Sequence, residues 1–360
     1  MARSIETMSV HAGEPRDKAH DSLVTPIILS TAYPFANTDE LHRYFRGEHQ
    51  RGEEYGRYGN PTQEVAEAKL AALDGGAAAL LTSTGMSAIV TTLMAMVRPG
   101  MHLIITADSY RKTRVFVREF LVKFGIEHTS CEPSVDGIAA ALKPNTRLII
   151  TESPTNPYNL QPLSFGIDLV VHSATKYLGG HNDLMAGVVV GKSDTIQAIR
   201  EHQGMVGSLA SPFTAYMLIR GLKTFAVRMR HQNASGQRIA EFLEAHPKVD
   251  RVWYPGLPSH PAHLIAKKVM RGFGSLISFT IKGSLIDASR VVDACEIPYL
   301  APSLGGPESL IEQPALMSYY DKSPEERQAL GIRENLIRLS IGLESADDLV
   351  ADLGQALDRL

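Results

Sequence analysis

The chain has few of the features that mark secreted, membrane-bound or nucleic-acid-binding proteins. It has two cysteines, Cys131 and Cys295, which cannot form a disulfide framework, so we expect a reducing, cytoplasmic location. The 36 basic and 39 acidic residues give a net charge of −3 with no basic block, which argues against a nucleic-acid partner. Residues 1–6 lack the apolar core of a signal peptide. The longest uncharged run, residues 75–97, carries several hydroxyl side chains and is interpreted as buried protein rather than a membrane span.

Sequence patterns typical of repeats, low-complexity segments and metal sites are also missing. We find no internal repeat and no His/Cys cluster with metal-ligand spacing, so no metal is expected. What is present is an ordinary globular composition, 44% hydrophobic and 21% charged, over 360 residues. That length is enough for two domains.

The most informative stretch runs from residue 168 to residue 187. An apolar run, residues 169–171, predicts a buried strand, and it is followed at once by Ser173, Thr175 and Lys176. Strand ends of this kind lie at the carboxyl edge of an α/β sheet, where such sheets bind ligands. A partly desolvated lysine can attack a carbonyl to form a Schiff base, and Ser173 and Thr175 can donate to an anion. These are the requirements of pyridoxal phosphate.

Other polar strings stand at predicted strand ends and turns. Their central residues are Arg57 in a turn, Gly85 between a strand and a helix, Tyr110 after a β-rich run at 102–106, and Asn156 after a strand at 148–150. Three of them also have an ordinary interpretation: a structural loop for Arg57, plain helix capping for Gly85, and simple packing for Tyr110. A single arginine on a strand, such as Arg338, is usually solvated.

Taken together, these strings resemble the Cys/Met-metabolism pyridoxal-phosphate enzymes, and the resemblance covers nearly the whole chain. It implies that Lys176 carries the cofactor and acts as acid and base, and that Tyr110 stacks on the ring. It assigns the remaining cofactor contacts to Tyr55, Arg57, Ser83, Gly85, Met86, Asn156, Ser173 and Thr175. It assigns substrate contacts to Arg338 and Ser303 for the α-carboxylate, and to Glu54, Glu308, Arg111 and Lys112 for the side chain.

Within this family, three regions resemble the plant-type cystathionine γ-synthases: residues 110–114, 297–306 and 315–320. The expected reaction is γ-replacement, in which an activated homoserine ester and cysteine give cystathionine. Arg111 and Lys112 would suit an anionic group on the ester. A γ-lyase acting on cystathionine, methionine or a related γ-substituted amino acid is the alternative, and an inactive homologue is a third interpretation.

The resemblance also implies a fold and an assembly. We expect the aspartate-aminotransferase-like fold (fold type I of these enzymes), an α/β class with a mostly parallel seven-stranded sheet. The expected parts are an N-terminal arm at 1–50, a cofactor domain at 51–228 and a smaller C-terminal α+β domain at 229–360. Members of the family are tetramers built from dimers that share active sites, so we expect a homotetramer.

One part of the family pattern is missing. After the strand that ends before Asn156-Pro157, the family has a helix and a further parallel strand, which carries an aspartate for the pyridine nitrogen. Here Pro157 is followed directly by Tyr158 and the sequence that normally lies beyond that aspartate. The omission is roughly 30 residues, about one strand-and-helix unit. We therefore expect the full polypeptide to contain this unit, so that the structure has a break in the backbone between Pro157 and Tyr158. An intact backbone there would instead favour the inactive homologue.

Overall fold

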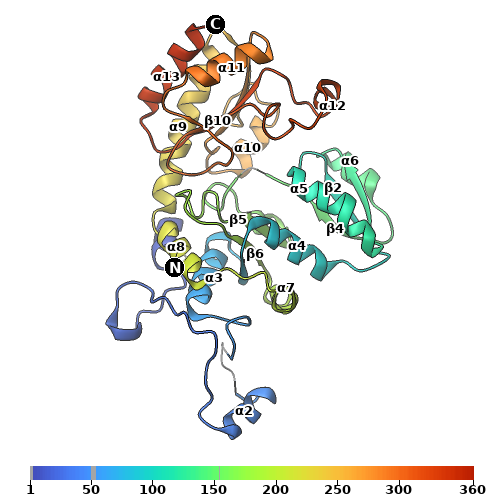
Figure 1. Ribbon diagram of the computed structural model, residues 1–360, viewed down its shortest axis with the longest axis vertical. Coiled ribbons are helices and arrows are strands. Elements are labelled where there is room, and N and C mark those ends of the chain that lie inside the picture. Colours follow the sequence, from blue (N-terminus) through green and yellow to red (C-terminus); the bar gives the residue numbers. More distant parts are fainter. Residues whose placement is uncertain (1–2, 50–53, 154) are drawn as a thin grey trace.

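The computed structural model describes residues 3–49, 54–153 and 155–360, and has a large domain, a smaller C-terminal domain and an N-terminal segment (Figure 1). Pro154, in the expected turn after the strand that ends at Ile150, lies outside the described residues. None of the helices in these ranges is long and apolar enough to cross a membrane.

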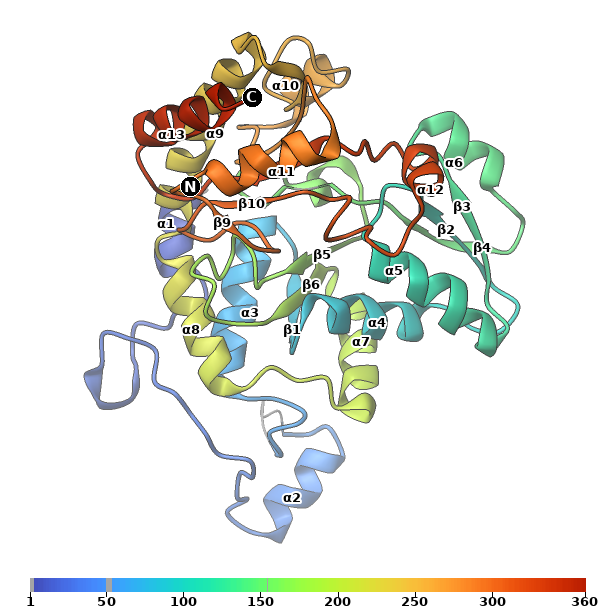
Figure 2. The ribbon, with the colours of Figure 1, turned by 45° about the horizontal axis from the view of Figure 1, so that its top comes forward.

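The N-terminal segment is an extended arm with short helices. They are α1 (Ile5–His11), a 3-10 turn η1 (Ala19–Asp21) and α2 (Thr38–Phe45). The arm leaves large apolar side chains in solvent: Leu23 is 88% exposed and Leu29 is 70% exposed. Both views place α2 away from the sheets (Figures 1 and 2). An arm with this exposure is typical of a segment that packs on another subunit.

The inner half of the large domain is a three-stranded sheet with the order β1-β6-β5, in which β6 is antiparallel to both neighbours. Helix α3 begins with Pro61, after Asn60, whose side chain accepts from the backbone N–H groups of Thr62 and Gln63. The elements of this half are α3 (Pro61–Asp74), β1 (Ala78–Thr82), α4 (Gly85–Met96), β5 (Leu169–Ser173), β6 (Gly187–Gly191), α7 (Ser193–Val206) and α8 (Pro212–Leu222).

The outer half is a second three-stranded sheet, with the order β3-β2-β4 and parallel pairing throughout. Its strands are β2 (His102–Thr106), β3 (Glu127–Cys131) and β4 (Thr146–Ile150), and its helical segments are α5 (Arg111–Val115), η2 (Phe116–Phe120), η3 (Leu121–Phe124) and α6 (Val135–Ala141). Both views show this half displaced from β5 and β6 (Figures 1 and 2).

The expected single seven-stranded, mostly parallel sheet is therefore wrong in its strand count, in its continuity and, for the inner half, in its pairing direction. The described residues of the large domain form six strands in two separate sheets, and between β4 and β5 they contain only a 3-10 turn, η4 (Pro162–Phe165). The physical reason is the missing unit. Without it, no strand lies between β4 and β5 to pair with both, so each of them is the last strand of its own sheet. Helix α4 joins the halves, because Leu93 packs with β2 while Ala88 packs with β6.

The expected break in the backbone is not observed. Residues 156–160 form a hydrogen-bonded turn, in which the Asn156 carbonyl accepts from the N–H groups of Asn159 and Leu160. The N–H of Tyr158 donates to Asn156 Oδ1 over 3.1 Å. The described chain thus passes through Pro157 and Tyr158 within one turn, and the omission appears as a short connection instead of a gap.

Helix α9 (Phe225–Ala245) connects the two domains without interruption. Its first turns pack in the large-domain core through Phe225 and Met229, and its last turns pack in the C-terminal core through Ile239 and Leu243. The expected boundary near residue 228 therefore lies inside one rigid helix. Helix α8 ends at Leu222, so a short break at residues 223–224 separates it from α9.

The C-terminal domain is a five-stranded sheet with the order β7-β8-β11-β10-β9, covered by helices. Ile277, Phe279 and Ile281 of β8 are fully buried, as their alternation predicts. The elements are β7 (Val249–Trp253), α10 (His263–Val269), β8 (Leu276–Ile281), α11 (Leu285–Ala294), β9 (Tyr299–Leu300), β10 (Leu310–Glu312), α12 (Pro324–Ala329), β11 (Leu336–Ser340) and α13 (Ala346–Asp358).

A buried polar pair ties α3 to β5. His172 Nε2 lies 2.8 Å from Asp74 Oδ2, and the Asp74 side chain is fully buried. Burial alone would lower the pKa of His172, but the charge of Asp74 and the hydrogen bond to it outweigh burial and raise that pKa. Because the folded-state pKa lies above the unfolded value, this stabilisation is complete below the unfolded pKa and is lost as the pH rises through the folded one.

We predict that Asp74→Asn destabilises the protein more in mild acid than in base. The loss in the free energy of unfolding should be about 1.5–3 kcal/mol at about pH 6, the range for a hydrogen bond to a charged group, and smaller at about pH 9. Urea unfolding at the two pH values measures it. Asp287→Asn is the control, because hydrogen bonds from Ser284 lower the pKa of Asp287 and keep it ionised at both. Equal losses for Asp74→Asn at the two pH values would rule out a charged His172.

Candidate functional site

Lys176 lies in the turn that follows β5, with its amine directed at the C-terminal domain. Its Nζ donates to the hydroxyl of Ser303 over 2.6 Å. Burial lowers the pKa of Lys176, and the positive charge of Arg338 lowers it further. Both effects increase the share of uncharged amine, which is the nucleophilic form.

Arg228, which the sequence analysis did not single out, holds this turn in place. It extends from α9 and donates to the carbonyl oxygens of Tyr177 (2.8 Å) and Gly221 (3.0 Å). It is 4% exposed, and burial lowers its pKa to about 10. Gly180 has a φ of +72° and packs against the guanidinium, so a side chain there would displace it. The available signal was one arginine within the apolar start of a helix.

The junction of β1 and α4 lies against the end of β5. Thr84 caps α4 by accepting from the N–H of Ser87 over 2.9 Å. A Cβ atom added to Gly85 would lie 2.8 Å from the Cβ of Ser173, so only glycine allows this approach. The first-turn N–H groups of a twelve-residue helix thus lie next to the exposed Ser173, an arrangement that suits a phosphate group. Ser83 directly precedes the cap, and its N–H donates to the Ser208 carbonyl.

Two predicted phosphate and cofactor contacts have other partners. The Thr175 hydroxyl donates to the Ala186 carbonyl (3.2 Å) and accepts from the Ala186 N–H (3.0 Å), so it fixes the lysine turn to the residue before β6. Met86 accepts a weak bond from the Thr113 hydroxyl through its sulfur. Their roles at a cofactor stay predictions.

Tyr110 and Asn156 lie where the two outer strands β2 and β4 lead into the site. Tyr110 precedes α5, and its side chain is half exposed, so its ring is free to stack on a ligand. Its backbone N–H donates to Glu152 over 2.6 Å. Asn156 is 2% exposed and uses its Oδ1 within the 156–160 turn, whereas its Nδ2 is buried and makes no hydrogen bond with any described residue. A buried amide donor without an acceptor requires a partner, and a ligand atom is one kind of partner.

Arg338 and Ser303 lie on the other side of Lys176. Arg338, on β11, donates through Nη2 to the Ser303 carbonyl over 2.9 Å, and its Nη1 lies 2.8 Å from Glu312 on β10. Ser303 has a φ of +99°, which is a strained conformation for a residue other than glycine. One residue thus accepts from Lys176 through its side chain and from Arg338 through its backbone, which brings the two cations close to each other.

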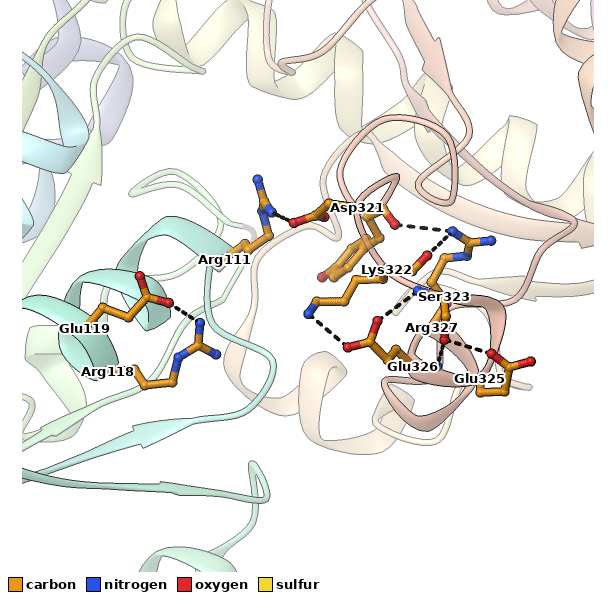
Figure 3. A network of polar contacts seen from close by, with 10 residues as sticks. Arg111, Arg118, Glu119, Asp321, Lys322, Ser323, Glu325, Glu326 and Arg327 are labelled. Carbon is orange, nitrogen blue, oxygen red and sulfur yellow. Dashed lines mark hydrogen bonds and ion pairs between the residues drawn. The ribbon is translucent and has the colours of Figure 1, made fainter.

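Arg111 is paired with an acidic residue of the C-terminal domain. Its Nη1 lies 2.7 Å from Asp321 Oδ2, just before α12, and Figure 3 shows this contact across the space between the domains. A polar network around α12, including Lys322–Glu326 at 3.3 Å, lies beside it in the same view. The neighbouring Lys112 is exposed. Both cations are partly accessible to an incoming anion.

The remaining predicted residues have partners elsewhere in the chain. Arg57 donates to the Gly204 carbonyl at the end of α7 over 2.7 Å, and its guanidinium lies over the ring of Tyr58. Tyr55 is 45% exposed and pairs with Ala32 of the arm in an isolated bridge. Lys176 and Arg57 thus contact different elements within one subunit.

The two predicted specificity carboxylates are also separate from each other. Glu54 accepts from the N–H of Tyr33 through its backbone carbonyl. Glu308 accepts from Asn182 Nδ2 over 2.7 Å, close to the lysine turn. The described residues contain no group of three or more His, Cys, Asp or Glu side chains that could hold a metal ion.

Comparison with known proteins agrees with this geometry. The family model described as Cys/Met metabolism PLP-dependent enzyme matches residues 6–159 and 156–358. Cystathionine gamma-synthase 1, chloroplastic, from Nicotiana tabacum is 44% identical over 388 aligned positions, which cover 98% of this chain and 72% of that protein. L-methionine gamma-lyase from Treponema denticola is 38% identical over 98% of this chain and 96% of its own length.

Solved structures of related enzymes also resemble this chain in fold. Cystathionine gamma synthase from Xanthomonas oryzae pv. oryzae, in complex with aminoacrylate and cysteine, superposes with a TM-score of 0.93 at 34% identity, and the match covers 100% of this chain and 99% of that one. The same enzyme in complex with cystathionine gives a TM-score of 0.92.

The matches also locate the omission. Because 98% of 360 residues is about 353, about 35 of the 388 positions aligned with the tobacco protein have no counterpart here (388 − 353). The two stretches of the family model meet at residues 156–159, which form the turn between β4 and β5. The family model thus breaks at the turn where the sequence analysis placed the missing strand-and-helix unit.

The residues present fit three of the four contacts that we expect pyridoxal phosphate to make. Lys176 has a lowered pKa, the α4 N-terminus lies against Ser173 in an approach that a Cβ at Gly85 would block, and Asn156 holds an unused buried donor. The fourth side, a carboxylate for the pyridine nitrogen, belongs to the omitted strand. Asp168 and Asp183 are exposed on either side of the lysine turn and do not replace it. With motifs, fold and site in agreement, the chain belongs to the PLP-dependent enzymes of Cys/Met metabolism.

Proposed function

We propose that this enzyme catalyses γ-replacement, in which an activated homoserine ester and cysteine give cystathionine and the free acid of the ester. The observation that carries the proposal is the Lys176–Ser303–Arg338 arrangement. It sets a base of lowered pKa beside a guanidinium that can hold an α-carboxylate. A base and a carboxylate anchor that both bind Ser303 can serve proton removal from the α-carbon of an amino acid.

The chain's residues then have distinct tasks. Pyridoxal phosphate, when bound, supplies the electron sink. Lys176 holds it and moves protons at the α- and β-carbons, while Arg338 and Ser303 orient the carboxylate. Tyr110 stacks on the ring, and the α4 N-terminus with Ser83, Gly85, Met86 and Ser173 holds the phosphate. Arg111 and Lys112 attract an anionic group on the ester, and Glu54 and Glu308 contribute to side-chain specificity.

The choice of a synthase rests on the relatives. Two plant cystathionine gamma-synthases are 44% and 43% identical to this chain, compared with 37–38% for four bacterial methionine gamma-lyases. A γ-lyase acting on cystathionine, methionine or a related amino acid is the alternative, because those enzymes also match over nearly the whole chain. An inactive homologue is the third possibility, and the split sheet without its aspartate-bearing strand favours it.

We predict that borohydride fixes the cofactor to Lys176. The reason is that Lys176 joins a lowered pKa to a position beside the anion site. Reduction of the yellow enzyme followed by peptide mapping should place the label on Lys176, and Lys176→Ala should be colourless. Lys192, a lysine of the same domain beyond β6, gives the matched Lys192→Ala control, which should keep the colour. A label on any other lysine would overturn the assignment.

Product analysis separates the three functions. We expect cystathionine from an O-acyl- or O-phosphohomoserine with cysteine, and 2-oxobutanoate with ammonia as a slower product without cysteine. The assay compares O-succinyl-, O-acetyl- and O-phosphohomoserine by chromatography of the products. Turnover of cystathionine or methionine in preference to the esters would indicate the lyase. No turnover of any of them by protein of intact mass near 39.3 kDa would indicate the inactive homologue.

The same assay tests the cationic pair. Arg111→Glu should raise KM for the succinyl and phospho esters at least about tenfold and for the acetyl ester much less, because like charges repel at short range. Arg118→Glu, on the adjacent segment η2 and paired with Glu119, is the matched control and should change neither value. Equal effects of Arg111→Glu on all three esters would reduce this residue to a structural partner of Asp321.

We also propose that the enzyme is a homotetramer, a dimer of dimers in which Tyr55 and Arg57 serve the neighbouring subunit. The proposal is supported by the exposed arm and by the contacts of Arg57, which lie on α7 and Tyr58 instead of the lysine turn. A cytoplasmic location stays a prediction, because two plant relatives carry names that place them in the chloroplast.

Mixing inactive subunits tests the sharing. Arg57→Ala and Lys176→Ala should each be inactive alone, and mixing them should restore part of the activity, since a hybrid dimer contains one site with both native residues. The measurement is activity after subunit exchange verified by mass. Exchange without recovery would show that Arg57 acts within its own subunit.

A further inference from the structure

Glu312 is a buried carboxylate close to the site to which the proposed reaction gives no task. It is 1% exposed, and neither of its oxygens accepts a well-formed hydrogen bond from the residues that the structure describes. Among the described residues, its one ionic contact is with Arg338 Nη1, which lies 2.8 Å from Oε1. A buried charge with so few partners is costly to keep, so it requires an explanation other than stability.

The sheet fixes this pair. Strands β10 and β11 are antiparallel, and their register places Glu312 directly opposite Arg338, with Ser278 of β8 on the other side of Arg338. Directly opposite side chains lie on the same face of a sheet, so Glu312 and Arg338 project together. The contact is therefore part of a rigid element, not of a loop that adjusts when a ligand binds.

Arg338 divides its donors between two partners and keeps an accessible portion. Nη1 faces Glu312, and Nη2 donates to the Ser303 carbonyl over 2.9 Å. The side chain of Arg338 is still 22% exposed, whereas that of Glu312 is 1% exposed. An incoming carboxylate can thus reach the guanidinium from the site, with Glu312 already bound on the protein side.

We propose that Glu312 sets how tightly Arg338 holds the α-carboxylate, by repelling a second anion on the same guanidinium. This inference rests on the proposed function, which assigns the substrate carboxylate to Arg338. Substrate and product carry the same α-carboxylate, so an unopposed arginine would hold both strongly and slow the release of product. Glu312 weakens the binding of the α-carboxylate, which substrate and product share. Contacts with the rest of the molecule are then left to distinguish substrate from product.

A neutral residue of the same size at position 312 tests the repulsion between Glu312 and the substrate carboxylate. Glu312→Gln keeps an oxygen that can accept from Arg338 and removes the negative charge. L-norvaline, which has no γ leaving group, should bind the holoenzyme about tenfold more tightly in this variant, a change of about 1.4 kcal/mol. L-norvalinamide, which lacks the carboxylate, should bind unchanged. The Kd values come from titration of the cofactor absorbance.

Two controls separate the possible outcomes. Glu334→Gln alters another Arg–Glu pair of the same domain, in which Arg327 Nε lies 2.7 Å from Glu334, and should change neither Kd. Arg338→Ala should abolish the preference for norvaline over its amide; if the preference persists, the proposed carboxylate anchor fails. If Arg338→Ala behaves as expected but norvaline binds Glu312→Gln no more tightly than wild type, only the present inference fails.

A second neutral variant guards against misfolding. Glu312→Met has a similar length and no charge, and it should show the same fall in the norvaline Kd if its thermal melting matches that of the wild type. Weaker norvaline binding in both neutral variants, with normal melting, would show that Glu312 only orients Arg338, and would overturn the proposal.

Discussion

The site depends on one buried guanidinium. Arg228 binds the backbone carbonyls of Tyr177, after the lysine, and of Gly221, at the end of α8, while its own helix continues into the C-terminal core. Removing an arginine from such a position leaves several carbonyls without donors in a place that water does not reach. Because α9 belongs to both hydrophobic cores, this contact also fixes where Lys176 lies relative to β11.

Around that anchor, three cations and one carboxylate are confined with little solvent. Arg228 and Arg338 have pKa values lowered by burial, and Lys176 is further affected by Arg338. Such a cluster has an excess of positive charge, which a phosphate and an amino-acid carboxylate would balance. Burial raises the pKa of Glu312, while the charge of Arg338 lowers it in part, as expected for a carboxylate that faces a shared counter-ion. The excess positive charge of the site thus matches anionic ligands.

The sequence predicted the parts of this structure that depend on local patterns. The strands predicted at residues 102–106, 148–150 and 169–171 follow from the hydrophobic pattern, and the structure confirms them as β2, β4 and β5. Arg228 and Glu312 were missed, because a charged residue is buried by its tertiary partners and no local pattern shows those partners. The hydroxyl of Thr175 was assigned to an anion from its alternation with Ser173, yet it bonds to Ala186 across the turn. The separation of β4 from β5 needed the whole topology, since pairing partners lie far apart in the chain.

The divided sheet changes how the large domain holds together. In a continuous sheet, backbone hydrogen bonds would connect all the strands from β3 to β1. Here the outer three strands are joined to the rest by the apolar faces of α4, the 156–160 turn and the Arg111–Asp321 contact. Side-chain packing and a partly exposed ion pair are weaker restraints than a hydrogen-bonded ladder. We therefore expect the outer half to open more readily than the lysine turn. Since it carries Tyr110, Arg111 and Lys112, the same opening would move one wall of the site and leave the base in place.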